Sequence, residues 1–392
     1  MPADALTARP SAAGARVTRS AASRRTAREQ GASLDQGASL DDYRLLGRSG
    51  LRVSPLALGT VTFGPEWGWG AERKEAQRMF DSYVDRGGNF IDSASTYTNG
   101  TAERFVGDFA AGRRDRLVIA TKYSGATHED DPNSGGNHRK SMMRSVEQSL
   151  RQLQTDYIDL LYLHAWDGTT QVEEVLRAMD DLIHAGKVLY VGICGTPAWQ
   201  VSRMQAIADL RGWAPLVALQ TSYSLIERSG ERELIPMALE MGLGVVGWSP
   251  LGSGVLTGKY SRADLAGDGA SAPAATRKSL AAASGALSER GLAIADVVKH
   301  VADELETSPP RVALAWTLLN SAVTAPIIGA RTLAQLEEDL GAFELELSAD
   351  HRTRLEDASA IEPGFAHELL LRRGTILASA PKGKARARAS AS

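Results

Sequence analysis

The sequence predicts an α/β fold in which eight parallel strands, each followed by a helix, close into a (β/α)8 TIM barrel. Short runs rich in Leu, Ile and Val alternate with longer segments whose apolar residues recur at helical spacing. This alternation repeats over eight units at a spacing of roughly 30 residues, which is long enough for a helical crossover between parallel strands. Eight such units close without a free edge. An open doubly wound sheet is the competing architecture.

The predicted elements follow one another in regular order. The strands are expected at residues 55–58, 89–92, 117–121, 157–163, 188–193, 217–221, 244–248 and 324–328. The helices are expected at residues 74–86, 102–111, 138–152, 172–185, 198–210, 231–241, 292–305, 310–320 and 332–340. Most of these helices are followed by glycine, which readily adopts the left-handed conformation that ends a helix.

Three segments depart from the alternation. Residues 43–53 predict an N-terminal β-hairpin that would plug the lower mouth of the barrel. Residues 261–288 are rich in Ala, Gly and Ser, and they predict a mobile surface loop, with a flap over a ligand as one interpretation. Extra helices are expected after the eighth strand.

The composition excludes several classes of protein. The chain has 392 residues, of which 43% are hydrophobic and 23% charged, as in an ordinary globular protein. Its apolar runs are too short to span a bilayer. The only cysteine, Cys194, excludes an internal disulfide or a thiolate metal cluster and favours a reducing compartment, so we expect a cytoplasmic location. The seven histidines show no paired ligand spacing, and no metal is expected.

Charge is distributed unevenly and indicates the domain boundaries. Residues 1–40 carry six arginines against three acidic residues, and residues 372–392 carry six basic residues and no acidic one. Both basic tails are expected to be disordered, and the first also fits a transit peptide. Residues 41–371 are then a single acidic domain, which argues against a nucleic-acid partner. The sequence does not predict the oligomeric state.

Ionisable residues follow three adjacent strands of the predicted barrel. Asp92 and Tyr97 follow the second strand, Lys122 the third and His164 the fourth. Because the carboxyl ends of parallel strands face one mouth of a barrel, we expect these side chains to lie together. Taken singly, each has an ordinary structural explanation as a cap, a packing residue, a solvated charge or a core histidine. Their shared position favours a functional explanation.

The chemistry of this set fits proton transfer to a carbonyl oxygen. A tyrosine hydroxyl has a pKa near 10, and a nearby ammonium lowers it towards the working range of an acid catalyst. A carboxylate beside the lysine would keep the ammonium charged, and a histidine can donate a hydrogen bond to the substrate oxygen. The set therefore suits protonation of an oxygen as hydride reaches the carbon, or the reverse reaction.

The chain resembles the aldo-keto reductase family at residues 58–64, 90–97, 121–122, 161–164, 247–260 and 326–340, in the family's order, from about Tyr43 to Leu355. The resemblance implies a barrel that binds NADP(H) without a Rossmann domain and reduces aldehydes or ketones, with a small-molecule carbonyl substrate as partner. It makes Tyr97 the general acid, Lys122 the group that lowers its pKa, Asp92 the partner of the lysine, and His164 the group that orients the carbonyl.

The same resemblance implies a cofactor site made of Gly59, Thr60, Cys194, Gln220, Tyr223, Ser249, Leu251, Gly254, Gly329, Arg331, Gln335 and Asp339. Tyr223 would stack on the nicotinamide ring and Gln220 would hold its carboxamide. Residues 249–254 suit the pyrophosphate. Arg331, at the start of the last helix, suits the adenosine 2′-phosphate and implies a preference for NADP.

Two positions depart from the family's pattern. Asp339 aligns with an adenine contact that is more usually asparagine. Cys194 and Gly195 replace the usual Ser-Asn or Ser-Asp pair beside the nicotinamide amide, and a thiol is a weak donor.

The substrate pocket and the function leave alternatives open. Phe63, Trp67 and Trp69 follow the first strand and Trp166 follows the fourth, where all of them would line an apolar mouth. The first hypothesis is an NADPH-dependent carbonyl reductase. The alternatives are an NADP(H)-binding regulatory subunit like the potassium-channel β subunits, and an alcohol dehydrogenase that works towards oxidation. The sequence does not predict the natural substrate.

Overall fold

The computed structural model describes residues 39–128, 130–265 and 276–369. Apart from residues 39 and 40, the two predicted basic tails lie outside these described residues, and so does part of the segment 261–288. Within the described ranges, no helix combines the length and the apolar character needed to cross a bilayer.

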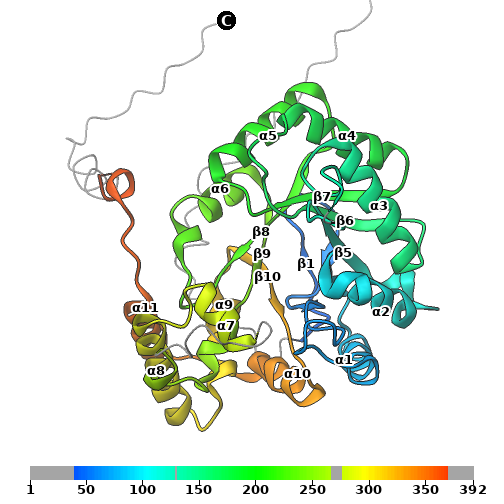
Figure 1. Ribbon diagram of the computed structural model, residues 1–392. Coiled ribbons are helices and arrows are strands. Elements are labelled where there is room, and N and C mark those ends of the chain that lie inside the picture. The colour runs from blue at the N-terminus through cyan, green and yellow to red at the C-terminus, as the bar shows by residue number, and fades with distance from the viewer. Residues whose placement is uncertain (1–38, 129, 266–275, 370–392) are drawn as a thin grey trace, which may run out of the picture.

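The predicted barrel is confirmed. Eight parallel strands pair in the closed order β10-β3-β4-β5-β6-β7-β8-β9, with the helices arranged around them (Figure 1). The strands are β3 (Ala57–Gly59), β4 (Phe90–Asp92), β5 (Val118–Tyr123), β6 (Ile158–Leu163), β7 (Val188–Cys194), β8 (Leu216–Ser222), β9 (Gly244–Trp248) and β10 (Val323–Ile328). Each lies within two residues of its predicted position at both ends, because eight connected strands leave little freedom in register.

A helix follows each strand, and extra helices precede and follow β10. These helices are α1 (Arg73–Asp85), α2 (Thr101–Ala110), α3 (Arg139–Leu153), α4 (Val172–His184), α5 (Ala198–Arg211), α6 (Leu234–Met241), α7 (Arg277–Ala283), α8 (Glu289–Glu304), α9 (Pro309–Leu319), α10 (Leu333–Leu340) and α11 (Ala349–Ser359). Two of them, α5 and α6, end at Gly212 and Gly242, whose φ angles of 64° and 70° are ones that glycine adopts without strain.

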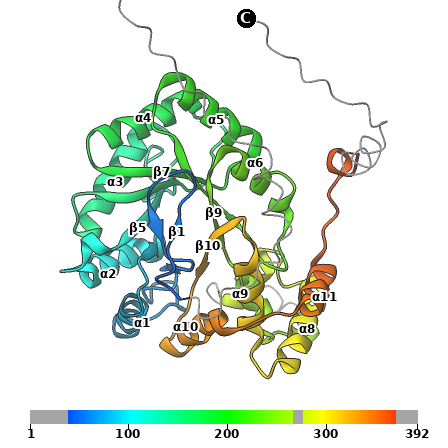
Figure 2. The same ribbon diagram turned by 180° about the vertical axis from the view of Figure 1, so that it is seen from behind.

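The N-terminal hairpin covers the amino-terminal mouth of the barrel, as predicted (Figure 2). Its strands β1 (Arg44–Leu45) and β2 (Arg52–Val53) pair antiparallel. The amide of Arg48 donates to the carbonyl of Gly242 over 2.7 Å. A Cβ added at Gly47 would lie 2.5 Å from two backbone oxygens, so the turn fits closely against β8 and β9. In the part of the chain that the structure describes, the mouth left open is therefore the one at the carboxyl ends of the strands.

The segment 261–288 differs from the prediction of a loop. Its described part contains α7 and the short 3-10 helix η6 (Arg262–Leu265). Thr276 and Ser279 form a reciprocal capping box at the start of α7. Alanine is the strongest helix former, so the composition that resembles a flexible loop here also supports a capped helix.

The interior of the barrel positions the site. Side chains alternate along each strand, and an inner core of Leu46, Val53, Ala57, Phe90, Val118, Ala120, Leu160, Tyr162, Val217, Ala218, Val246, Ala325 and Ile327 fills the barrel. The outer faces of the strands pack against the helices in a second core. A residue two positions beyond an inner core residue therefore also points inward, at the open mouth.

Candidate active site

The alternation along the strands brings the predicted catalytic residues together. Asp92 lies two residues after the inner residue Phe90, Lys122 after Ala120 and His164 after Tyr162. The same alternation directs Gln220 on β8 and Trp248 on β9 towards the open mouth. The site is thus formed by polar residues that stand two positions after the last inward-facing apolar residue of a strand.

Lys122 is at the centre of a buried polar cluster. Its Nζ lies 2.5 Å from Asp92 Oδ2 and donates to the carbonyl of Ser93 over 2.7 Å. Gln220 Nε2 donates to the other carboxylate oxygen of Asp92 over 2.7 Å. Lys122 and Asp92 are 1% and 2% exposed. Burial alone would lower the pKa of Lys122, but the attraction of Asp92 and Tyr97 outweighs it and raises that pKa, so the lysine stays charged.

A strained turn places Tyr97 over the lysine. The hydroxyl of Tyr97 lies 3.2 Å from Lys122 Nζ. The turn after it, η2 (Tyr97–Gly100), holds Thr98 and Asn99 at φ angles of 45° and 54°. For the β-branched Thr98 this conformation is unfavourable. It is held because the Thr98 hydroxyl donates to the carbonyl of Phe63 over 2.6 Å and accepts from the amide of Ala102.

Burial raises the pKa of Tyr97, while the charge of Lys122 opposes the shift and Asp92 adds to it. The net direction differs from the prediction that the lysine brings this pKa below its ordinary value. The phenol is therefore protonated at neutral pH, which is the form that a proton donor needs. Lys122 still reduces the cost of the phenolate that remains after the proton has left.

His164 faces the same space as Tyr97. The two ring centroids are 6.1 Å apart, with the ring planes 76° from each other. Burial and the charge of Lys122 lower the pKa of His164 to about 4. The imidazole is thus neutral at physiological pH, and it can donate one hydrogen bond without carrying a charge.

A cavity of about 1360 Å³ opens over this cluster. Asp92, Tyr97 and His164 line it. Of the residues predicted to bind the cofactor, the cavity is lined by Gly59, Cys194, Gln220, Ser249, Leu251, Gly254, Gly329, Arg331, Gln335 and Asp339. These residues come from five different strand ends and from α10, so one continuous space joins the catalytic cluster to the last helix.

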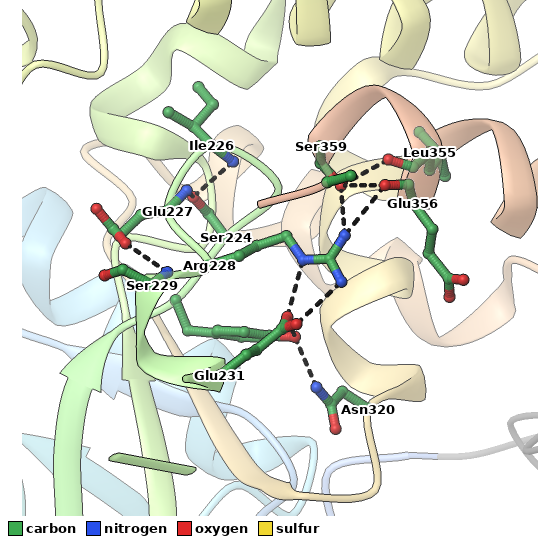
Figure 3. A network of polar contacts seen from close by, with 12 residues as sticks. Ser224, Ile226, Glu227, Arg228, Ser229, Glu231, Asn320, Leu355, Glu356 and Ser359 are labelled. Carbon is green, nitrogen blue, oxygen red and sulfur yellow. Dashed lines mark hydrogen bonds and ion pairs between the residues drawn. The ribbon is translucent and has the colours of Figure 1, made fainter. Parts of the chain in front are cut away.

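Tyr223 does not line this cavity, which corrects the prediction that it stacks on a nicotinamide ring. Its fully buried ring stacks on Trp316, with centroids 5.5 Å apart. Its hydroxyl donates to Glu231 and accepts from Asn320. Figure 3 shows Glu231 and Asn320 in the polar network around Arg228. The aromatic side chain of Trp248, at the end of the neighbouring strand β9, does line the cavity.

Thr60 is also placed behind the cavity wall. It is fully buried, and its hydroxyl donates to the main-chain carbonyl of Asp92 over 3.1 Å. It supports the strand that carries Asp92 and has no surface for a cofactor.

Two of the predicted substrate residues lie elsewhere. Phe63 is fully buried against Phe109, and Trp166 packs on the outer core; neither lines the cavity. Trp67 and Trp69 do line it, with ring centroids 5.7 Å apart. Trp67 also meets the ring of Tyr97 edge-on at 6.4 Å. The cavity therefore has an aromatic wall next to the catalytic tyrosine.

Two cations of the cavity wall, Lys259 and Arg277, were not predicted from the sequence. Lys259 and Arg277 line the cavity together with Arg331, and within the described ranges none of the three forms an ion pair with a carboxylate. Burial lowers the pKa values of Lys259 and Arg277, and repulsion from Arg331 lowers them further. The guanidinium of Arg277 lies 5.1 Å from the ring centre of Trp69.

Three cations that pair with none of the described carboxylates make a site for an anion, because an anion relieves both their burial and their mutual repulsion. Lys259 approaches the backbone at Gly254, where a Cβ atom would lie 2.8 Å from Lys259 Nζ. The absence of a side chain at Gly254 therefore leaves room for this cation. Arg331 precedes α10, whose first residue follows the cap Thr332. The donor set therefore fits the phosphate groups of a phosphorylated dinucleotide.

Cys194 lies in the cavity wall at the end of β7. Burial raises the pKa of its thiol to about 11, so the sulfur is neutral and weakly polar at physiological pH. Among the described residues, no group of three or more His, Cys, Asp or Glu side chains is arranged to hold a metal ion.

Comparison with known proteins agrees with this geometry. Residues 55–360 match the model of the aldo/keto reductase family. The chain is 38% identical over 339 residues to a norsolorinic acid reductase of Aspergillus flavus, covering 84% of both chains. It is 35% identical over 338 residues to an aryl-alcohol dehydrogenase (NADP(+)) of Phanerodontia chrysosporium, covering 82% of this chain and 86% of that one. A putative aryl-alcohol dehydrogenase of Saccharomyces cerevisiae is 33% identical over 346 residues.

The chain belongs to the aldo/keto reductase family. The resemblance predicted from its motifs is thereby confirmed, and the protein is an oxidoreductase of this family.

Proposed function

We propose that the protein is an NADPH-dependent carbonyl reductase that converts aldehydes or ketones to alcohols, with Tyr97 as the general acid. The observation that carries the proposal is the Tyr97 hydroxyl, 3.2 Å from a buried and charged Lys122, in a cavity that also contains neutral His164. A proton donor, a cation that stabilises its conjugate base and an orienting donor are what carbonyl reduction requires.

Each of these residues has a separate task. His164 donates a hydrogen bond that orients the carbonyl oxygen towards the phenol. Tyr97 gives its proton to that oxygen as negative charge develops there. Lys122 stabilises the resulting phenolate, and Asp92, held by Gln220, keeps the ammonium charged and fixed. Run in the opposite direction, the same groups remove the proton of an alcohol.

The cations of the cavity support NADP(H) as the cofactor. Arg331, Arg277 and Lys259 would bind its phosphates, and Trp248 offers the aromatic face next to the reacting ring. The bound cofactor would supply the hydride to the carbonyl carbon. The aryl-alcohol dehydrogenase relative is named for NADP(+), which agrees with this assignment.

The aromatic wall supports an aryl aldehyde or ketone as the substrate class. Trp67 meets Tyr97 edge-on and Trp69 lies beside Trp67 in the cavity wall, and aromatic rings pack favourably against such side chains. The name of one relative, aryl-alcohol dehydrogenase, fits the same class.

The test is NADPH oxidation with a panel of aromatic and aliphatic carbonyl compounds. Tyr97→Phe is expected to lower the rate of the chemical step by about 10²–10⁴-fold while NADPH binding is retained. Tyr43→Phe, at an exposed tyrosine of the hairpin, is the matched control and should leave the rate unchanged. An unchanged rate in Tyr97→Phe would remove the acid assignment. Slow turnover of every carbonyl, with tight cofactor binding, would favour the regulatory alternative.

The cofactor preference has its own test. Arg331→Ala is expected to weaken NADPH binding and to leave NADH binding almost unchanged, because only NADPH carries the 2′-phosphate. Arg86→Ala, at an exposed arginine, serves as the control for a lost surface charge. Equal losses for both cofactors would show that Arg331 does not bind the 2′-phosphate.

A further inference from the structure

Two hydrogen bonds connect the loop between β3 and α1 with the segment that carries Tyr97. The Thr98 hydroxyl donates to the carbonyl of Phe63 over 2.6 Å. Three residues further along both segments, the hydroxyl of Thr101 donates to Glu66 Oε1. Thr101 is the first residue of α2 and is only 5% exposed. The two segments therefore lie side by side and are bonded to each other at two places.

The tip of the loop, residues 64–70, has few other restraints. It contains three glycines, two of which have positive φ angles of 108° and 78°, and glycine leaves a chain more conformational freedom than any other residue. Main-chain hydrogen bonds between residues 62–64 and Ala71 close the base of the loop. Within the described part of the chain, the bond of Glu66 to Thr101 is the one side-chain hydrogen bond between the tip and the rest of the protein.

Gly64 makes room for the carboxylate at this place. A Cβ atom at Gly64 would overlap Glu66 Oε2 and would lie 3.0 Å from side-chain atoms of Thr98 and Thr101. No side chain caps the N-terminus of α2, and a carboxylate near that end also interacts favourably with the helix dipole. The loop and the start of α2 are therefore shaped to hold Glu66, which itself lines the cavity.

Trp67 is the residue whose position depends most directly on this bond. It follows Glu66 in the chain, and its ring meets the ring of Tyr97 edge-on at 6.4 Å. Trp69 has a separate support, because the guanidinium of Arg277 lies 5.1 Å from its ring centre. A bond from Glu66 to the segment of Tyr97 therefore sets the spacing between the aromatic wall and the proton donor.

We propose that Glu66 is a positioning residue that holds Trp67 beside Tyr97 and thereby sets the affinity of the site for aryl carbonyl substrates. The inference rests on the proposed function, because it concerns the substrate of that same site. The hydroxyl of Tyr97 is held independently by Lys122, so the bond affects substrate binding and not the chemical step. A small aliphatic carbonyl does not depend on the bond, because it has no ring to pack against Trp67.

The experiment is steady-state reduction of 2-naphthaldehyde and of propanal at saturating NADPH. Glu66→Leu removes the acceptor and keeps a similar volume, and it should raise KM for 2-naphthaldehyde about three- to tenfold, the range that one lost hydrogen bond supports, with kcat unchanged. KM for propanal and Kd for NADPH should change by less than about twofold. Glu66→Gln keeps an acceptor oxygen and should bring KM for 2-naphthaldehyde back to within about twofold of the natural value.

Further variants show whether the effect acts through Thr101 and Trp67. Thr101→Val removes the donor and keeps the branched shape, so it should raise KM as Glu66→Leu does, and the double variant should show no further rise. In a Trp67→Ala background, Glu66→Leu should have no effect on KM. Glu72→Leu, at an exposed carboxylate just before α1, is the matched control and should keep the natural KM.

Three results would overturn the inference while the assignment as a carbonyl reductase stands. They are an unchanged KM for 2-naphthaldehyde in Glu66→Leu, an equal rise for propanal, and a rise that persists in the Trp67→Ala background. Urea unfolding shows whether Glu66→Leu is folded under the conditions of the assay, and Thr101→Val provides the same test if it is not. Failure of the natural protein to oxidise NADPH with any carbonyl would instead overturn the proposed function.

Discussion

Replacing Lys122 by methionine tests how much the buried cation contributes to catalysis. Methionine fills a similar volume without the charge. Two unit charges 3.2 Å apart interact by about 5 kcal/mol at an effective dielectric constant of 20, so this is the stabilisation that Lys122 gives to a fully formed phenolate at Tyr97. If the proton is half transferred in the transition state, half of that energy acts there. A loss of between half and all of this stabilisation corresponds to a decrease of about 10²–10⁴-fold in the rate of the chemical step.

The same substitution leaves Asp92 as a buried carboxylate without its partner. Removing one member of a buried ion pair costs about 3–5 kcal/mol of stability, and this pair is 2.5 Å apart and almost fully buried. The double variant Asp92→Asn with Lys122→Met removes the lone charge, and it should regain most of the lost stability without regaining activity.

Two measurements check this pair of expectations. Single-turnover oxidation of bound NADPH reports the chemical step, and urea unfolding followed by tryptophan fluorescence reports stability. A loss in rate below about tenfold in Lys122→Met would refute the electrostatic argument for Tyr97. A double variant that is less stable than Lys122→Met would refute the argument for the buried charge.

Three further outcomes follow from the geometry. In binding titrations, Trp248→Ala should weaken NADPH binding about tenfold or more, whereas Tyr223→Phe should change it by less than about twofold. The reverse order would restore the prediction that Tyr223 stacks on the nicotinamide ring. The rate of carbonyl reduction should show no step near pH 6.5 from His164, because its pKa of about 4 keeps it neutral, and a step there that is lost in His164→Gln would contradict this. Arg228→Gln leaves the partly buried carboxylate of Glu231 without its two-point partner and should lower the urea midpoint more than Arg232→Gln does at the exposed neighbour.

The parts of the fold that repeat were predictable from the sequence. Each strand is a short apolar run between helical segments, and the closed barrel allows few alternative arrangements of eight such units. The meeting of Asp92, Lys122 and His164 followed from the same regularity, because each stands at the inward position just past a strand. Tyr97 was also indicated by its place after the second strand, but the turn that holds it depends on Thr98 and its bond to Phe63.

What escaped prediction depends on details that strand order does not determine. Tyr223 and Trp248 both follow apolar strands, but Tyr223 stands one residue beyond the end of β8 and turns outward to Trp316, whereas Trp248 keeps the inward alternation of β9. Trp248 could have been predicted by counting two residues on from Val246, which faces the inside of the barrel. No such signal exists for Arg277, because it lies on a helix outside the barrel repeat and its place in the cavity depends on tertiary packing alone.

The direction of the Tyr97 shift changes how the site should be understood. A phenol with a strongly lowered pKa would lose its proton before the substrate arrives, whereas burial keeps the proton in place until negative charge develops on the carbonyl oxygen. Lys122 then acts on the product of the proton transfer, since the phenolate is charged and the phenol is not. Because the same dry surroundings raise the cost of any isolated charge, the cation must itself be compensated, and the bonds of Asp92 to Lys122 and Gln220 meet that requirement. The buried pair is therefore best understood as the support of a proton donor rather than as a source of stability.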